Sequence, residues 1–225
     1  MVRHLAIILD GNRRWAKANG LPTLEGHRRG YDNVKKIGLA ALDRGVGFLT
    51  VFVFSTENWN RTKEEVTYLM DLLLWALTEE LSFYMKENVR LKIVGGRAGL
   101  SPKIIEAIER AEKQTAANTR GQINLCLNYG GRAEIVEAAK RLVADGLKPE
   151  EVDEAAFAAR LWTVGLPDPD LIIRTSGEHR LSGFLTWSGT YSELYFTEKM
   201  WPDFDERALD EALAEFEKRE RRFGK

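Results

Sequence analysis

Cysteine is nearly absent from this chain of 225 residues, because Cys126 is its only one. A single thiol excludes an intrachain disulfide, and we therefore expect a reducing compartment, the cytoplasm. Long apolar runs are missing too, since none approaches the roughly 18 residues of a membrane-spanning helix, and we expect no signal peptide. Neither sign of charge is in excess. The net charge of −1 gives no support for nucleic acid as a partner.

Familiar catalytic motifs are absent as well. The sequence contains no Walker A motif, no G-x-G-x-x-G and no H-E-x-x-H. No two aspartates are adjacent, which excludes an aspartate-rich metal motif. The pairs Asp168/Asp170 and Asp203/Asp205 have the spacing of turns and helix caps. The polar clusters described below are therefore the candidate sites.

Strand-like and helical patterns alternate along the chain. Apolar runs typical of buried strands lie at residues 5–9, 48–54, 89–94, 123–127 and 171–173. Helical patterns lie at residues 26–44, 64–86, 103–117 and 133–144, with a short helix near 152–161 and a last one after Asp205. This alternation predicts right-handed crossovers, and hence an α/β fold with a central, mostly parallel sheet flanked by helices. Length and the lack of a linker predict a single domain over residues 1–225.

The helix expected at residues 64–86 is apolar around most of its circumference, whereas a surface helix needs one apolar stripe. One interpretation buries it between the sheet and another layer, or in a dimer contact. The other lets one face line an apolar cavity for a long hydrocarbon. Periodicity alone does not separate the two.

The strand expected at residues 5–9 runs directly into Asp10, Gly11 and Asn12, followed by Arg13 and Arg14. In open α/β sheets ligands bind where central strands end. A carboxylate there suits a hard cation, and guanidiniums near a helix start suit a diphosphate. The alternatives are that Asp10 caps the following helix and that the arginines are solvated surface charges.

Two further polar clusters follow apolar strands. Residues 54–61 supply Ser55, Glu57, Asn58 and Arg61, with Trp59 as a flat apolar wall, and the alternative is an ordinary loop. Residues 174–182 place two arginines six positions apart, with Ser176 and Ser182, in a pattern that suits a second phosphate group. Three such clusters at three strand ends predict one shared site.

Three other features each leave two interpretations open. Glu193 precedes an apolar run and either pairs with an arginine or binds metal. His27 lies near a helix start. It is either a helix-capping or surface histidine, or it donates to phosphate or moves a proton. The tail at residues 219–225 is either a solvated basic end or a group that reaches an anion in a neighbouring subunit.

At these clusters the chain resembles a cis-prenyltransferase, the family of undecaprenyl diphosphate synthase. The resemblance covers nearly the whole chain, and its motifs lie at residues 4–16, 26–27, 54–61, 128–132, 173–182, 193–196, 201–204 and 221–224. It implies that the chain is a Mg²⁺-dependent transferase with an apolar tunnel beside its sheet. It also implies a homodimer that contacts the membrane surface transiently when product is released.

The resemblance assigns a role to each cluster. The catalytic residues it implies are Asp10 and Asn58, and the metal ligands are Asp10 and Glu193, with Glu193 acting across the dimer. The allylic diphosphate, typically farnesyl diphosphate, is expected to bind Gly11, Asn12, Arg13, Arg14, Trp15, His27, Ser55, Thr56, Glu57, Trp59 and Arg61. Isopentenyl diphosphate is expected to bind Arg174, Arg180, Leu181, Ser182, Arg222 and Gly224, the last two from the partner subunit. Asn58 would assist proton removal, with the released diphosphate as the alternative proton acceptor.

The chain departs from the family pattern in a few places. Many relatives have arginine where this chain has Thr23, so that one diphosphate contact is missing or is supplied by Arg28. Gly183, Thr186 and Ser188 are also unusual, which bears on local rigidity and subunit packing.

Product length stays open. No obvious insertion follows the 64–86 helix, which favours a product of undecaprenyl-like length or shorter. Val51, Phe52 and Val53 lie on the strand beside the expected tunnel. Two other functions compete with this one: a non-catalytic partner subunit, which the presence of Asp10, Asn12 and Arg14 disfavours, and an unrelated phosphate-ester hydrolase.

Overall fold

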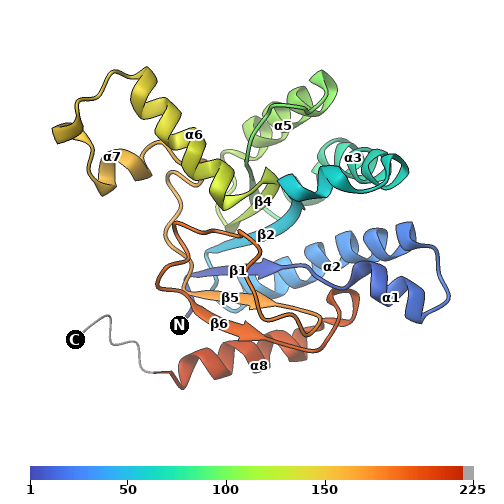
Figure 1. The fold of residues 1–225 in the computed structure, drawn as a ribbon. Coiled ribbons are helices and arrows are strands. Elements are labelled where there is room, and N and C mark those ends of the chain that lie inside the picture. The colour runs from blue at the N-terminus through green and yellow to red at the C-terminus, as the bar shows by residue number, and fades with distance from the viewer. Residues whose placement is uncertain (220–225) are drawn as a thin grey trace.

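A six-stranded sheet with the order β3-β4-β2-β1-β5-β6 forms the centre of the computed structural model, which describes residues 1–219 (Figure 1). All its neighbouring strands run parallel. The strands are β1 (His4–Ile8), β2 (Phe48–Ser55), β3 (Val89–Val94), β4 (Gly121–Tyr129), β5 (Leu171–Arg174) and β6 (Glu193–Phe196). The predicted α/β class and parallel sheet are confirmed. The strand β6 was missed, because its four residues are only half-buried and do not form a long apolar run.

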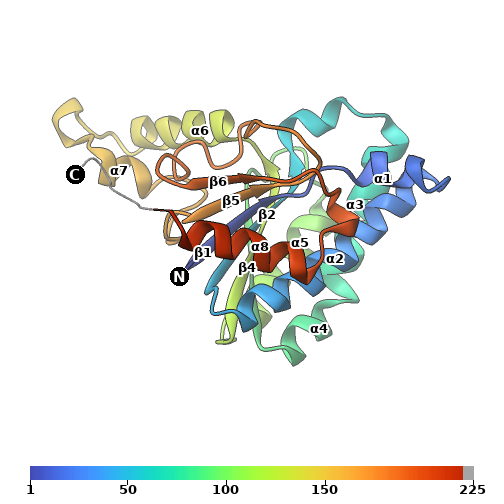
Figure 2. The same ribbon diagram turned by 90° about the horizontal axis from the view of Figure 1, so that it is seen from below.

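Helices cover both faces of this sheet, as the two views together show (Figures 1 and 2). Alternate residues of β1 explain why both faces are apolar, because Leu5 and Ile7 belong to one buried cluster and Ala6 and Ile8 to another. The larger cluster lies under α2 (Thr23–Asp43), α3 (Lys63–Thr78), α4 (Leu81–Lys86), α5 (Pro102–Thr115) and α8 (Glu206–Glu217). The opposite face carries α6 (Gly131–Ala144) and α7 (Glu154–Ala158).

The helix predicted at residues 64–86 is wrong as a single element, because it divides into α3 and α4. At the end of α3 the Thr78 hydroxyl donates to the Leu74 carbonyl oxygen at 2.9 Å, which competes with regular helical bonding. Glu80, in the joint, forms an ion pair with Lys35 of α2. The short helix expected near 152–161 is confirmed as the five-residue α7.

Two irregularities interrupt the pairing of β2 with β4 at the end that carries the site. Phe52 pairs with Cys126 and Phe54 with Leu127, so Val53 is an extra residue on β2. The next pair joins Ser55 to Tyr129, which leaves Asn128 as an extra residue on β4. Such bulges turn side chains out of the regular alternation of a strand.

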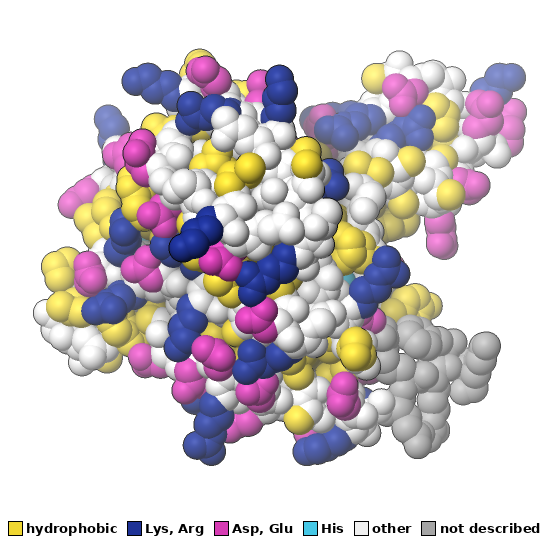
Figure 3. Space-filling model, turned by 180° about the vertical axis from the view of Figure 1, so that it is seen from behind, with side chains coloured by type: hydrophobic (Ala, Val, Ile, Leu, Met, Phe, Trp, Pro, Cys, Tyr) yellow, Lys and Arg dark blue, Asp and Glu magenta, His cyan; other side chains and the backbone are white. Residues whose placement is uncertain are grey.

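The surface of the molecule carries both signs of charge, and on the face seen in Figure 3 basic and acidic side chains are intermingled. Within residues 1–219, no helix has the length and apolar character needed to cross a membrane.

Candidate functional site

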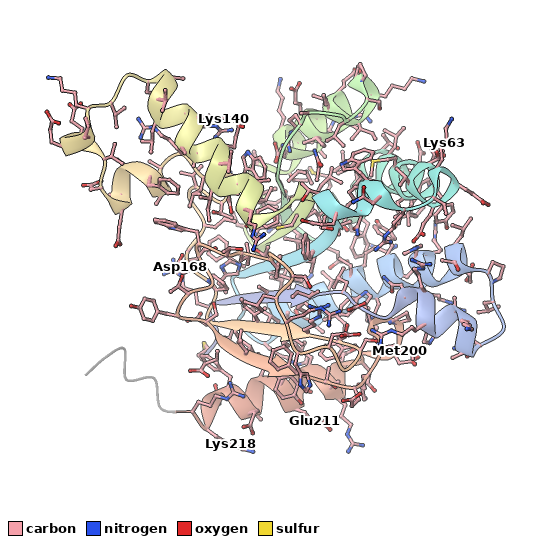
Figure 4. The ribbon with its side chains drawn as sticks, in the orientation of Figure 1. Lys63, Lys140, Asp168, Met200, Glu211 and Lys218 are labelled. Atoms are coloured by element: carbon pink, nitrogen blue, oxygen red, sulfur yellow. The ribbon has the colours of Figure 1, made fainter. Side chains whose placement is uncertain are left out.

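Asp10 follows β1 at the carboxyl edge of the sheet, and its neighbours hold it firmly. Its backbone oxygen accepts hydrogen bonds from the Thr175 hydroxyl at 2.7 Å and from the Trp201 amide at 2.9 Å. Its carboxylate accepts one from the Gly11 amide at 2.8 Å and one from Nη2 of Arg174 at 2.9 Å. Figure 4 places Met200, the residue before Trp201, on the side where the strands end, and Asp168 on the opposite side.

Gly11 makes the turn from β1 into α1 (Asn12–Ala18). Its φ of 108° lies in the left-handed region, and a Cβ atom would come within 2.8 Å of Oγ of Ser176. In the described part of the chain no side chain caps α1, since Asp10 bonds to the Gly11 amide instead. The helix-cap interpretation of Asp10 is therefore wrong, and the amino end of α1 is open to an anion.

A cavity of about 690 Å³ opens beside Asp10. Its polar lining includes residues from all three predicted clusters, namely Asp10, Asn12, His27, Ser55, Glu57, Asn58, Arg61, Arg174 and Ser182. Its apolar lining comes mainly from α2, β2, α3, α4 and β4, and includes Tyr31, Val34, Phe52, Val53, Leu69, Met70, Leu72, Leu73, Ala76, Tyr84, Leu125 and Leu127. The interpretation of the 64–86 segment as a cavity wall is confirmed for α3, while Val51 is buried in the core instead.

A second hollow, of about 840 Å³, shares Asp10, Asn12, His27 and Arg61 with the first. Its other lining residues include the basic side chains of Arg13, Arg14 and Lys17, together with uncharged residues such as Thr23. Arg28 does not line either hollow, because its guanidinium lies 3.9 Å from the centre of the Trp75 ring. That Arg28 supplies the diphosphate contact of an arginine at position 23 stays a prediction, and Lys17 is a cation that lines the same hollow as Thr23.

Glu65 connects the basic residues of the two hollows, and sequence analysis missed it. This carboxylate on α3 is 6% exposed; its Oε1 lies 2.8 Å from Nη1 of Arg61 and 3.0 Å from Nε2 of His27. Its Oε2 lies 3.8 Å from Nη1 of Arg13. Burial opposes ionisation, but the His27 hydrogen bond and the charges of Arg61 and Arg13 outweigh it and lower the pKa of Glu65. Burial lowers the pKa of His27.

Arg174, at the end of β5, links Asp10 to the third cluster. It is 4% exposed, and its Nη1 donates to Oγ of Ser182 at 2.8 Å. Its Nε has no hydrogen-bond partner in the described part of the chain. Arg180 is more exposed and forms an ion pair with Glu178, and Leu181 packs against the smaller apolar core.

Several predicted site residues do not line either hollow. Nε1 of Trp15 donates to Oδ1 of Asp203 at 2.8 Å, and Nε1 of Trp59 donates to Oδ1 of Asn128 at 2.8 Å. Thr56 packs beside Gly130 instead. Arg222 and Gly224 lie outside the described residues.

Glu193 lies far from Asp10 along the sheet. It pairs with Leu171 at the beginning of β5, whereas Asp10 lies beyond Ile8, the partner of Arg174 at the end of β5. Its Oε2 accepts from Nη1 of Arg219 at 2.9 Å, as the arginine-pairing interpretation predicts. Within one chain, Glu193 and Asp10 therefore cannot share a metal.

The beginning of α6 and the residue before it line the cavity, although no role was predicted for them from the sequence. Gly130, which joins β4 to α6, and Gly131, Arg132 and Ala133 in the first turn of α6 all belong to the lining. A Cβ atom at Gly131 would lie 2.1 Å from Oγ1 of Thr186, so the segment 183–186 can approach only a glycine. The glycine pair in the sequence was the one available indication of this close packing.

Comparisons with known proteins agree with this geometry. A family model described as "Putative undecaprenyl diphosphate synthase" matches residues 8–224. The isoprenyl transferase of Chromobacterium violaceum is 50% identical over 223 residues, which are 99% of this chain and 88% of the relative. The ditrans,polycis-undecaprenyl-diphosphate synthase ((2E,6E)-farnesyl-diphosphate specific) of Legionella pneumophila is 46% identical over 226 residues, 99% of this chain and 95% of the relative. The structure of lavandulyl diphosphate synthase from Lavandula x intermedia, in complex with dimethylallyl diphosphate, superposes with a TM-score of 0.95 at 39% identity, covering 100% of this chain and 98% of that one.

Proposed function

Because the chain belongs to the cis-prenyltransferase family and is an isoprenyl transferase, we propose that it condenses isopentenyl diphosphate with farnesyl diphosphate to give a Z-polyprenyl diphosphate. The observation that supports this most directly is one cavity lined both by charged and polar side chains of the strand ends and by apolar side chains of α2, β2 and α3. A diphosphate with a hydrocarbon tail matches both parts. A water-soluble phosphate ester would leave the apolar part without a purpose, which disfavours the hydrolase.

The allylic diphosphate fits the second hollow and its junction with the cavity. Arg13, Arg14 and Lys17 provide positive charge there, and the open amino end of α1 adds backbone amides. His27 and Arg61 stand at the junction, where the hydrocarbon would turn into the apolar cavity.

Isopentenyl diphosphate fits the opposite side of Asp10. Arg174 is buried there, its Nε has no hydrogen-bond partner among residues 1–219, and the Ser182 hydroxyl lies beside it. Arg180 would complete this site by leaving its ion pair with Glu178. Arg222 and Gly224 remain part of the proposal, in a partner subunit.

Asp10 fits a Mg²⁺ ion that is held mainly by its substrates. Its carboxylate is partly exposed and supplies hard oxygen donors. The described residues contain no group of three or more acidic, histidine or cysteine side chains that could hold a metal by themselves. Such an ion would take most of its ligands from diphosphate oxygens and water, as Mg²⁺ commonly does, with Asp10 supplying carboxylate oxygen. Glu193 would contribute only across a homodimer.

The charged and polar side chains near Asp10 would promote the reaction by stabilising charge and by positioning the substrates. The allylic C–O bond breaks, and its electrons leave with the diphosphate, whose growing charge Arg13, Arg14 and Arg61 stabilise. Bound Mg²⁺ would add to that stabilisation. The isopentenyl double bond forms the new C–C bond, and a proton is lost to the released diphosphate. Asn58 would position the reacting groups, because an amide is a poor base.

A short-chain product is the second candidate. Only Glu87 and Asn88 separate α4 from β3, so no insertion enlarges the wall that α3 and α4 form. This favours a product of undecaprenyl length or shorter. The apolar side chains of α2, β2 and α3 that line the cavity would limit how far the product can grow.

Product sizing tests both candidates. The purified chain should convert isopentenyl diphosphate, farnesyl diphosphate and Mg²⁺ into Z-polyprenyl diphosphates, and chromatography gives their length. Asp10→Ala should lower turnover by at least about 100-fold. The exposed Asp71 on α3 has no ion pair within residues 1–219, so Asp71→Ala serves as the matched control. No product from any allylic primer would contradict catalysis and leave the role of a non-catalytic partner subunit.

A further inference from the structure

Asn128 is the extra residue of β4 at the end of the sheet that carries the site. Its φ of 48° lies in the left-handed region, which non-glycine residues seldom adopt and asparagine tolerates better than most. The side chain is buried, and the pairing of β4 with β2 skips it. A bulge of this kind next to an active site commonly serves to aim one side chain away from the ladder.

The Asn128 amide joins two segments that are far apart in the sequence. Its Nδ2 donates to the backbone oxygens of Gly96 at 3.0 Å and Ala98 at 2.9 Å. Its Oδ1 accepts from Nε1 of Trp59 at 2.8 Å. The indole can only donate and the two carbonyl groups can only accept, so just one orientation of the amide satisfies all three partners.

Trp59 belongs to the 3-10 turn η1 (Thr56–Asn60), whose neighbours face the cavity. Ser55, Glu57, Asn58 and Arg61 all line that cavity, whereas Trp59 lines neither hollow. Its ring instead packs edge-on against Phe54, with centres 5.1 Å apart. The indole is therefore held by Asn128 and Phe54 and lines neither hollow.

A second contact holds the same turn, and it is made at Gly130, two residues after Asn128. Thr56 packs so closely on Gly130 that a Cβ atom there would lie 2.5 Å from the Thr56 hydroxyl oxygen. Asn128 and Gly130 thus hold both ends of η1 against the end of β4.

We propose that Asn128 is a positioning residue that fixes η1 on the sheet, with Trp59 as its attachment point and not as a substrate contact. This role explains why the chain accepts a left-handed residue with a side chain at this place, since glycine would remove the strain and the attachment together. Its effect on turnover rests on the proposed function, but its effect on the mobility of η1 does not.

The test compares Asn128 with a second asparagine whose φ also lies in the left-handed region. Asn88, just before β3, has a φ of 55° and exchanges two hydrogen bonds of 3.0 Å with Thr119. It lies where the strands begin, at the end of the sheet opposite the site. Asn128→Gly and Asn88→Gly each keep the backbone favourable and delete the side-chain bonds. Trp59→Phe removes the indole N–H alone and keeps an aromatic ring against Phe54.

Two readouts apply to each folded variant. Hydrogen exchange of the amides in residues 55–61 reports the mobility of η1, and steady-state kinetics report kcat/KM for both diphosphates. Asn128→Gly and Trp59→Phe should speed the exchange and lower kcat/KM by at least about tenfold, because small displacements of positioned groups are costly. Combining the two changes should cost no more than the larger single effect. Asn88→Gly should match the wild type in both readouts.

Each of the other outcomes contradicts either the positioning role of Asn128 or the proposed function. Unchanged exchange in Asn128→Gly, or an equal effect of Asn88→Gly, refutes the positioning role. If Asn128→Gly does not fold, Trp59→Phe decides alone, and wild-type behaviour of that variant refutes the proposal. If the wild type makes no product, the proposed function fails while hydrogen exchange still tests Asn128.

Discussion

Replacing Glu65 by glutamine should disconnect the basic residues that flank the two hollows. The substitution keeps the size of the side chain and removes its charge. Oε1 would still accept from Arg61 and His27, but without the charge that strengthens these bonds. The amide that replaces one oxygen would also face Arg13, since Oε2 lies 3.8 Å from that guanidinium.

The magnitude follows from distance and burial. Two unit charges at the 2.8 Å that separates Glu65 from Arg61 attract by about 6 kcal/mol at an effective dielectric constant of 20 and about 1.5 kcal/mol in water. Removing one partner of a buried ion pair typically costs about 3–5 kcal/mol. Arg61 is partly exposed, so we expect a loss of about 3 kcal/mol. For a chain of this size, that loss corresponds to a fall in Tm of about 6–12 °C.

Glu64→Gln is the matched control, because Glu64 precedes Glu65 on α3, is exposed and has no ion pair within residues 1–219. Thermal unfolding at pH 7 should separate the two variants, and KM for the allylic diphosphate should rise only in Glu65→Gln. Equal Tm values for the two variants would refute the assignment of Glu65 as the link among Arg13, His27 and Arg61.

The pH dependence supplies a second check on Glu65. Its pKa is lowered in the folded state, so its contribution is complete above the unfolded value of about 4.3 and is lost as pH falls through the folded value. The stability difference between the wild type and Glu65→Gln should therefore shrink below about pH 4. A difference that stays constant into acid would show that the charge of Glu65 is not what stabilises the fold.

Three further predictions concern other parts of the chain. Gly26→Ala places a Cβ atom 2.1 Å from the backbone oxygen of Asn12, and should cost at least about 1–3 kcal/mol in urea unfolding; a smaller loss would mean that α1 and α2 adjust freely. Burial lowers the pKa of His4, so its neutral form stabilises the fold above about pH 6.5 and less as pH falls; urea unfolding should show this slope in the wild type more than in His4→Gln. Arg174→Lys loses the planar fork that donates to Asp10, to Ser182 and to the Arg180 backbone oxygen, and should raise KM for isopentenyl diphosphate about tenfold; an unchanged KM would remove Arg174 from that subsite.

Local sequence patterns predicted the elements whose burial is either uniform or periodic. The strands β1 and β5 are buried at every position and read as short apolar runs, and the helices α5 and α6 follow from their periodicity. The pattern failed where neighbours decide the outcome. The run of β6 is as short as that of β5 but only half-buried, and the joint between α3 and α4 holds Glu80, whose ion-pair partner Lys35 lies on another helix.

The sequence by itself determined that three polar clusters follow apolar strands, and parallel strands bring such ends to one edge of a sheet. Asp10, Asn12, Asn58 and Arg174 are accordingly together at one cavity. Only the tertiary structure decided which side chains face that cavity and what holds them there. The contacts of Glu65 with His27 and of Asn128 with Trp59 join residues 38 and 69 positions apart, so no local pattern reveals them. Glu193 is separated from Asp10 by the length of the strands, because parallel register places it beside the first residue of β5.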